Sequence, residues 1–117
     1  MPTPEEEQII AQFRKEMRDA HSKPFHSRHH YDATGYLWLL DNLGAEGTAI
    51  HLIDQDEITP GLIKLATIEM LDCSSEAIIL RPKYRIPYLP STPERREKAR
   101  RKLSDNFDYS ASWDDGQ

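Results

Sequence analysis

The sequence predicts an α+β, helix-rich fold of about four helices with a small two-stranded sheet. Three Thr-Pro pairs, at residues 3–4, 59–60 and 92–93, each combine a side chain that caps free amides with a proline suited to the first helical position. Two short runs rich in aliphatic and β-branched residues, at 48–53 and 77–80, are typical of buried strands. With a helix between them, these strands would pair in parallel through a right-handed crossover.

The first helix is expected to begin at Pro4. Thr3 and Glu6 have the spacing of a capping box, in which each side chain bonds the other residue's amide. Apolar residues then recur at steps of three and four, which forms one stripe for the core. The stripe consists of Ile10, Phe13, Met17 and Ala20.

The second and third helices are expected to be more apolar. The second starts at Asp32 and ends at Gly44, since glycine suits the left-handed residue that closes a helix. The third follows Thr59 and puts Ile63, Ala66, Met70 and Cys73 on one face, so Cys73 is interpreted as a packing residue.

The run at 48–53 leaves an alternative fold open. Ala45, Ala49, Leu52 and Ile53 would also line one face of a helix, and periodicity alone does not decide between the two. An all-α arrangement is therefore the alternative prediction.

The domain organisation is expected to be a single globular domain over residues 1–103. A proline-rich basic arm, 81–93, and a basic helix, 93–107, would lie on its edge, because four prolines prevent regular helix in the arm. Residues 104–117 form an acidic aromatic tail, which either folds back on the basic helix or is captured by a partner or a second copy.

Charge is divided sharply along the chain. Residues 1–80 hold fourteen acidic and six basic residues, and residues 103–117 hold four acidic and none that are basic. Residues 81–102 hold nine basic and two acidic residues. Opposed patches of this kind favour fast, oriented association with a protein or nucleoprotein partner.

Composition excludes several classes. No stretch has the roughly 18 to 20 apolar residues that a membrane span requires, so no membrane partner is expected. Cys73 is the single cysteine, which rules out an internal disulfide and makes the cytoplasm the default location. No cofactor motif is present, so no cofactor is expected.

The candidate partner-binding residues alternate cations with aromatic rings, as phosphate contacts and base stacking require. The alternative is a solvated helix whose charges pair with one another, since Glu94 with Lys98 and Glu97 with Arg101 have i,i+4 spacing. The candidates are Arg81, Lys83, Tyr84, Arg85, Tyr88, Arg95, Arg96, Lys98, Arg100, Arg101, Tyr109 and Trp113.

Histidines gather in residues 21–30, where His26 and His29 with Asp32 could supply nitrogen and oxygen ligands to a divalent ion. They are expected to lie in a loop without the fixed spacing of a known metal motif, so surface or partner contacts are the favoured interpretation.

These observations predict a small non-enzymatic binding protein, a regulator or inhibitor that docks on a larger protein or nucleoprotein complex. Its basic arm and helix and its acidic aromatic tail would make the contacts. The alternatives are a direct nucleic-acid-binding protein, a small metal-dependent nuclease that uses the histidines of residues 21–30, and a chain that self-associates.

Overall fold

The described part of the structure, residues 1–22 and 34–117 of a computed structural model, is helical and holds no strand. The helices are α1 (Pro4–Asp19), α3 (Thr34–Asp54), α4 (Pro60–Thr67), α5 (Ser75–Ile78) and α6 (Pro93–Phe107). Two 3₁₀ turns, η1 (Leu71–Cys73) and η2 (Pro82–Tyr84), flank α5. The predicted two-stranded sheet is therefore wrong, and the all-α alternative fits.

The three Thr-Pro helix starts are confirmed. Thr3, Thr59 and Thr92 are each the residue before a helix, and each side chain accepts a hydrogen bond from an amide three residues on. Both bonds of the capping box between Thr3 and Glu6 are present. Local capping chemistry thus sets where α1, α4 and α6 begin.

The run at 48–53 is the second half of α3. Gly44 has φ of 72° and ψ of 177°, which interrupts the helix, but the chain resumes helical geometry directly afterwards and continues to Asp54. Thr48, Ala49 and Ile53 are buried whereas Ile50 is exposed, a pattern of helical rather than alternating spacing. Packing of this face against the core therefore outweighs the weak strand preference of the β-branched residues.

The run at 77–80 is also not a strand. Ser74 caps α5 by accepting a hydrogen bond from the amide of Ala77, and the following residues turn back through Leu80. All four residues of the run are buried, so their continuous apolar character reflects burial on every side.

The third helix is shorter than the stripe in the sequence predicted. It ends at Thr67, and Glu69 has a positive φ of 58° that breaks the helical path before η1. Ile63 is exposed, whereas Leu62 and Leu65 are buried and make the contacts of α4 with the core.

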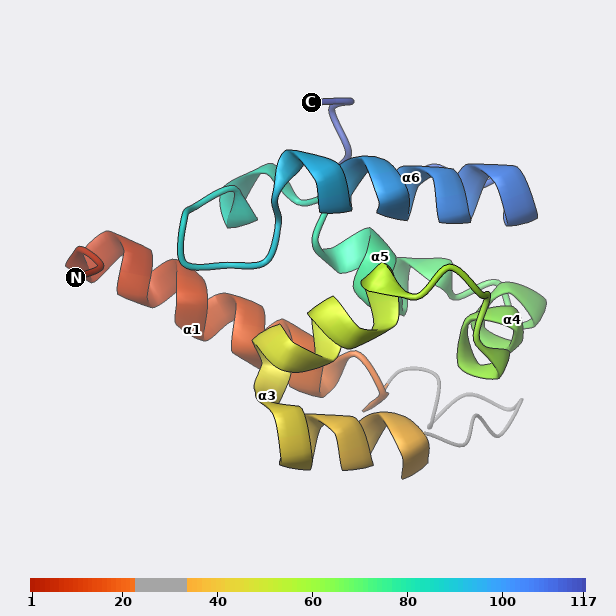
Figure 1. Cartoon of the computed structure of the whole chain (residues 1–117), viewed down its shortest axis with the longest axis horizontal. Helices are drawn as coiled ribbons and strands as arrows, with labels where there is room; N and C mark the ends of the chain where they lie inside the picture. The colour runs from red at the N-terminus through yellow and green to blue at the C-terminus, as the bar shows by residue number, and fades with distance from the viewer. Residues whose placement is uncertain (23–33) are drawn as a thin grey trace.

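The short helix α5 lies at the centre of the molecule. It packs against α1, α3 and α6, and α6 runs along one side of the domain with the chain's C-terminus close to the first turns of α6 (Figure 1). Ile78, Ile79 and Leu80 are almost fully buried, together with Phe13 and Met17 from α1. This centre holds α6 and the preceding arm in fixed positions relative to the body.

Candidate interaction site

The basic helix α6 is fastened to the body through the side that faces α3. The Arg95 guanidinium donates to both carboxylate oxygens of Asp54 at 3.0 Å, and the Lys98 ammonium lies 2.8 Å from the Asp56 carboxylate. The bond from Arg95 lowers the pKa of Asp54, against an opposing effect of burial. Arg95 and Lys98, two of the predicted partner-binding cations, therefore form ion pairs with carboxylates of the same chain.

Residues 108–117, the end of the tail, fold back along α6. Asp108 adopts left-handed geometry at the end of α6, and the amide of Tyr109 donates to the carbonyl of Leu103. Ala111 is buried. The indole N–H of Trp113 donates to the carbonyl of Ala77 at 2.7 Å, which anchors the tail to α5.

The indole ring of Trp113 is covered by a guanidinium. Arg81 lies over the ring with its central carbon 3.8 Å from the centroid, the geometry of a cation–π contact. Arg81 is itself fixed by Glu16 of α1, whose Oε2 accepts from the Arg81 Nε at 2.7 Å. The ring therefore lies between the arm and the central helix.

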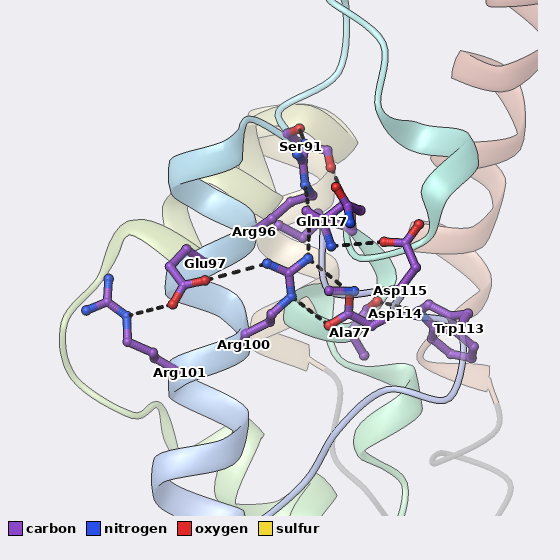
Figure 2. Close-up of polar contacts among 12 residues, drawn as sticks. Ala77, Ser91, Arg96, Glu97, Arg100, Arg101, Trp113, Asp114, Asp115 and Gln117 are labelled. Atoms are coloured by element: carbon purple, nitrogen blue, oxygen red, sulfur yellow. Dashed lines mark hydrogen bonds and ion pairs between the residues drawn. The ribbon is translucent and has the colours of Figure 1, made fainter.

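The two acidic residues after Trp113 each meet an arginine. Asp114 accepts two hydrogen bonds from Arg100, at 2.7 and 3.0 Å (Figure 2). Asp115 accepts two from Arg85, one of them at 3.0 Å. Paired N–H···O bonds between a guanidinium and a carboxylate fix the direction of both groups as well as their distance.

The last residue is also held. The backbone carbonyl of Gln117 accepts from Arg96 Nε at 3.0 Å and from Arg100, and Arg96 donates in addition to the carbonyl of Ser91 at 2.6 Å. We call residues 113–117 together with Arg81, Arg85, Arg96 and Arg100 the tail clasp. In it, Arg81 covers the aromatic ring of Trp113, and three further guanidinium groups from the arm and α6 bind the residues that follow.

The carboxylates of the clasp are held in their ionised form. Burial opposes ionisation of Asp114, but the bonds from Arg100 and the amide of Gly116 lower its pKa below the ordinary value. The bond from Arg85 and the amide of Gln117 lower the pKa of Asp115 to about 2. Both groups therefore bind the clasp as anions.

Tyr84, one of the predicted partner-binding residues, is a core residue. Its ring meets the ring of Phe13 edge to face, with centroids 5.1 Å apart, and its hydroxyl donates to Glu16 Oε1 at 2.5 Å. Burial, followed by this bond to a carboxylate, raises the pKa of Tyr84. Tyr84 thereby orients Glu16 and, through it, Arg81.

The other predicted residues divide between surface and interior. Lys83, Tyr88 and Arg101 are exposed, and Arg101 lies 3.7 Å from Glu97 on the same helix. Tyr109 is half-buried. The clasp thus brings together Arg81, Arg85, Arg96, Arg100 and Trp113, and leaves Lys83, Tyr88, Arg95, Lys98, Arg101 and Tyr109 outside it.

The proposed metal ligands His26, His29 and Asp32 lie outside the described residues. Among the residues that are described, no group of three or more His, Cys, Asp or Glu side chains could hold a metal ion. None of the described helices has both the length and the apolar character needed to cross a membrane.

Sequence reasoning did not find the groups that accept hydrogen bonds from Arg81 and from the indole of Trp113. Glu16 lies 65 residues from Arg81, and the Ala77 carbonyl lies 36 residues from Trp113. Because every residue has a backbone carbonyl, the sequence does not indicate which one accepts a hydrogen bond from the indole. The one available signal was the charge division itself, because a basic segment between acidic ones predicts internal pairing as readily as a partner.

Within the described residues, the protein is a small all-helical domain. Its most specific site is the tail clasp, in which arginine side chains surround an acidic aromatic segment. Comparisons of the chain with protein-family models, with curated proteins and with solved structures found no match.

Proposed function

We propose that this chain is a small non-enzymatic binding protein, a regulator or inhibitor that docks on a larger protein or nucleoprotein complex, and that the tail clasp is its recognition site. One observation carries the proposal. Arg81 covers the ring of Trp113, and Asp114 and Asp115 each accept paired hydrogen bonds from an arginine. Clusters of arginines recognise acidic segments of partner proteins in the same way.

The occupant seen in the clasp indicates the chemistry of the partner. A competing segment would place an aromatic ring under Arg81 and carboxylates against Arg100 and Arg85. Buried tryptophan and arginine side chains are the residue types that most often dominate binding energy at protein interfaces. The proposed ligand class is therefore an extended protein segment in which an aromatic residue precedes two acidic ones.

One end of the clasp is open to solvent. The Asp115 side chain is 45% exposed, whereas the Arg100 and Asp114 side chains are 20% and 10% exposed. Water competes with Arg85 for the Asp115 carboxylate, so this is the end of the tail that a competing segment would displace first. The tail nevertheless has the advantage of being tethered, which corresponds to a local concentration of roughly millimolar.

The charge of the basic segment supports a protein partner over bare nucleic acid. Arg81, Arg85, Arg95, Lys98, Arg100, Arg101 and Lys102 each have a carboxylate within 4.0 Å in the described part of the chain. Phosphate binding by these seven side chains would require their ion pairs to break first. The histidines and the aspartate proposed as metal ligands lie outside the described residues, so the metal-dependent nuclease stays an untested alternative.

A peptide with the sequence of residues 108–117 tests the proposal. The full chain is compared with a variant whose own tail is released, Trp113→Ala with Asp114→Asn and Asp115→Asn, and binding of the fluorescein-labelled peptide is followed by anisotropy. We expect the released variant to bind the peptide at least about tenfold more tightly than the original chain, because the original tail no longer competes.

Two controls make the result specific. A peptide with asparagine in place of both aspartates should bind the released variant far more weakly, since the paired arginine contacts need carboxylates. Adding Arg100→Ala to the released variant should have the same effect. Equal binding of the peptide with and without the Arg100 guanidinium would contradict the proposal.

A further inference from the structure

The end of the tail, residues 108–117, runs back along α6 in the direction opposite to the helix. Near its start it bonds the carbonyl of Leu103, further on it pairs with Arg100, and its last residue accepts a hydrogen bond from Arg96. Each of these contacts joins the segment to the rest of the domain. A second copy of the chain presents the same partner groups, so the segment can form the same contacts there.

The segment turns back at Asp108. Its φ of 52° lies in the left-handed region, which costs free energy at any residue other than glycine, although less for aspartate than for most. With right-handed geometry at this residue, α6 would continue instead of ending. The last turn of α6 lies at the edge of the molecule, so the prolonged helix would carry the segment away from its own domain (Figure 1). Short hinges under strain favour exchange of a segment between copies.

The directions of helix and segment fit a closed dimer. A released segment leaves along the direction of its own α6, whereas a bound segment runs opposite to the α6 on which it lies. Two copies that exchange segments therefore hold their α6 helices antiparallel, as a twofold axis perpendicular to the helices requires. Residues 108–112 connect α6 to Trp113 and span at most about 17 Å when extended, so the two helix ends must lie close together.

We propose that a second copy of this chain is a partner of the tail clasp: two chains exchange residues 113–117, and each segment binds the clasp of the other chain. The inference rests on the proposed function, because it uses the same site and the same class of acidic aromatic segment. It adds a mode of regulation. A partner protein must then compete with the tail of another chain, whose occupancy of the clasp rises with concentration.

The hinge, rather than the clasp, sets the strength of the dimer. The contacts within the clasp are the same in monomer and dimer and cancel, which leaves the local concentration of a tethered segment, roughly millimolar, as the starting value for the dissociation constant. Loss of the left-handed geometry lowers this value by roughly three- to tenfold at each of the two hinges. We therefore expect a dissociation constant of about 10 to 100 µM.

Sedimentation equilibrium of the full chain, from about 5 µM to about 1 mM, measures the association. Asp108→Gly removes the strain of the left-handed residue and should weaken the dimer about tenfold or more. Asp108→Ala increases that strain and favours the prolonged helix, so it should strengthen the dimer. The matched control is Glu69→Gly, at the other non-glycine residue with a positive φ among those described. It lies outside the tail and should leave the dissociation constant unchanged.

A mixture of isotope-labelled and unlabelled chains identifies the exchanged contact. Isotope-filtered spectra of the dimer should show nuclear Overhauser effects between Trp113 of one chain and Ala77 of the other, whose indole nitrogen and carbonyl oxygen lie 2.7 Å apart in the clasp. A chain that stays monomeric at about 1 mM, a dimer without this intermolecular effect, or equal dissociation constants for the glycine and alanine variants of Asp108 would overturn the inference.

The peptide experiment on the tail clasp separates this inference from the proposed function. If the labelled peptide binds the released variant while the full chain stays monomeric, the exchange is wrong and the proposed function stands. An exchanged dimer together with no binding of the peptide has the opposite meaning.

Discussion

The Lys102 ammonium lies 3.1 Å from the Glu76 carboxylate, with both side chains 6% exposed, and it also donates to the carbonyl of Leu52 at 2.8 Å. A single side chain of α6 thereby joins the central helix α5 to the end of α3. Buried pairs add modest net stability, but removing one partner leaves an uncompensated charge in a poorly solvated place.

Lys102→Met should therefore lower the free energy of unfolding by about 3 to 5 kcal/mol. The matched control is Lys98→Met, one turn earlier on the same helix, whose partner Asp56 is 96% exposed and which should cost only a small fraction of that loss. Urea denaturation followed by circular dichroism measures both. Comparable losses in the two variants would show that the Glu76 contact is not what makes Lys102 important.

The double variant Lys102→Met with Glu76→Leu provides the coupling between the two residues. It removes the charge that the single variant leaves unpaired, so its loss should be smaller than the sum of the two single losses. Additive losses would contradict the ion pair as the source of the effect.

The second prediction concerns Gly44, which joins the two halves of α3. Its φ of 72° and ψ of 177° belong to a region that is open to glycine alone. Gly44→Ala should cost about 1 to 3 kcal/mol in the free energy of unfolding. Gly35→Ala, in the first turn of the same helix, should instead stabilise by about 0.5 kcal/mol, because the added Cβ meets open space and alanine favours helix. Thermal unfolding of both proteins measures the contrast, which a loss of similar size in each would contradict.

How far the sequence could predict the fold is clearest from the threonines. Thr3, Thr59 and Thr92 act within three residues of themselves, so the helix starts follow from local chemistry and were predicted correctly. The run at 48–53 was predicted wrongly because its secondary structure depends on which faces become buried, a property of the whole domain.

The candidate site shows the same division. The sequence shows directly that residues 81–102 are basic and that the tail is acidic and aromatic. These opposite charges were enough to predict contact between the tail and the basic helix as one of the alternatives. The sequence could not predict the partner of each cation. Arg100 pairs with Asp114 whereas Lys102 pairs with Glu76, because neighbouring residues on one helix point in different directions.

The third prediction concerns the cap of α6, on which the positions of its cations depend. The Oγ1 of Thr92 accepts a hydrogen bond from the amide of Arg95 at 3.2 Å. Thr92→Ala should lower the free energy of unfolding by about 1 kcal/mol. Thr92→Ser should lower it much less, because serine keeps the hydroxyl that caps the helix. Denaturation in urea compares the three proteins. A serine variant as unstable as the alanine variant would contradict capping as the cause.

The last prediction concerns acid release of the tail. Arg100 and Arg85 hold the pKa values of Asp114 and Asp115 below those of the free tail, that of Asp115 at about 2. Because the bound values are the lower ones, the stabilising contribution is complete above the ordinary aspartate pKa of about 3.9 and is lost as the pH falls toward 2.

In a Trp38→Phe background, Trp113 is the single tryptophan and reports its own release by a shift of its emission to longer wavelength. We expect that shift between about pH 4 and pH 2. Circular dichroism over the same range separates it from unfolding of the body, where Asp54 and Glu46 also have lowered pKa values. Adding Asp114→Asn and Asp115→Asn should flatten the profile of Trp113, because neither residue then titrates. A tail that stays bound to pH 2 in the Trp38→Phe chain, or a profile that the asparagine variant reproduces, would mean that the two carboxylates do not hold it in place.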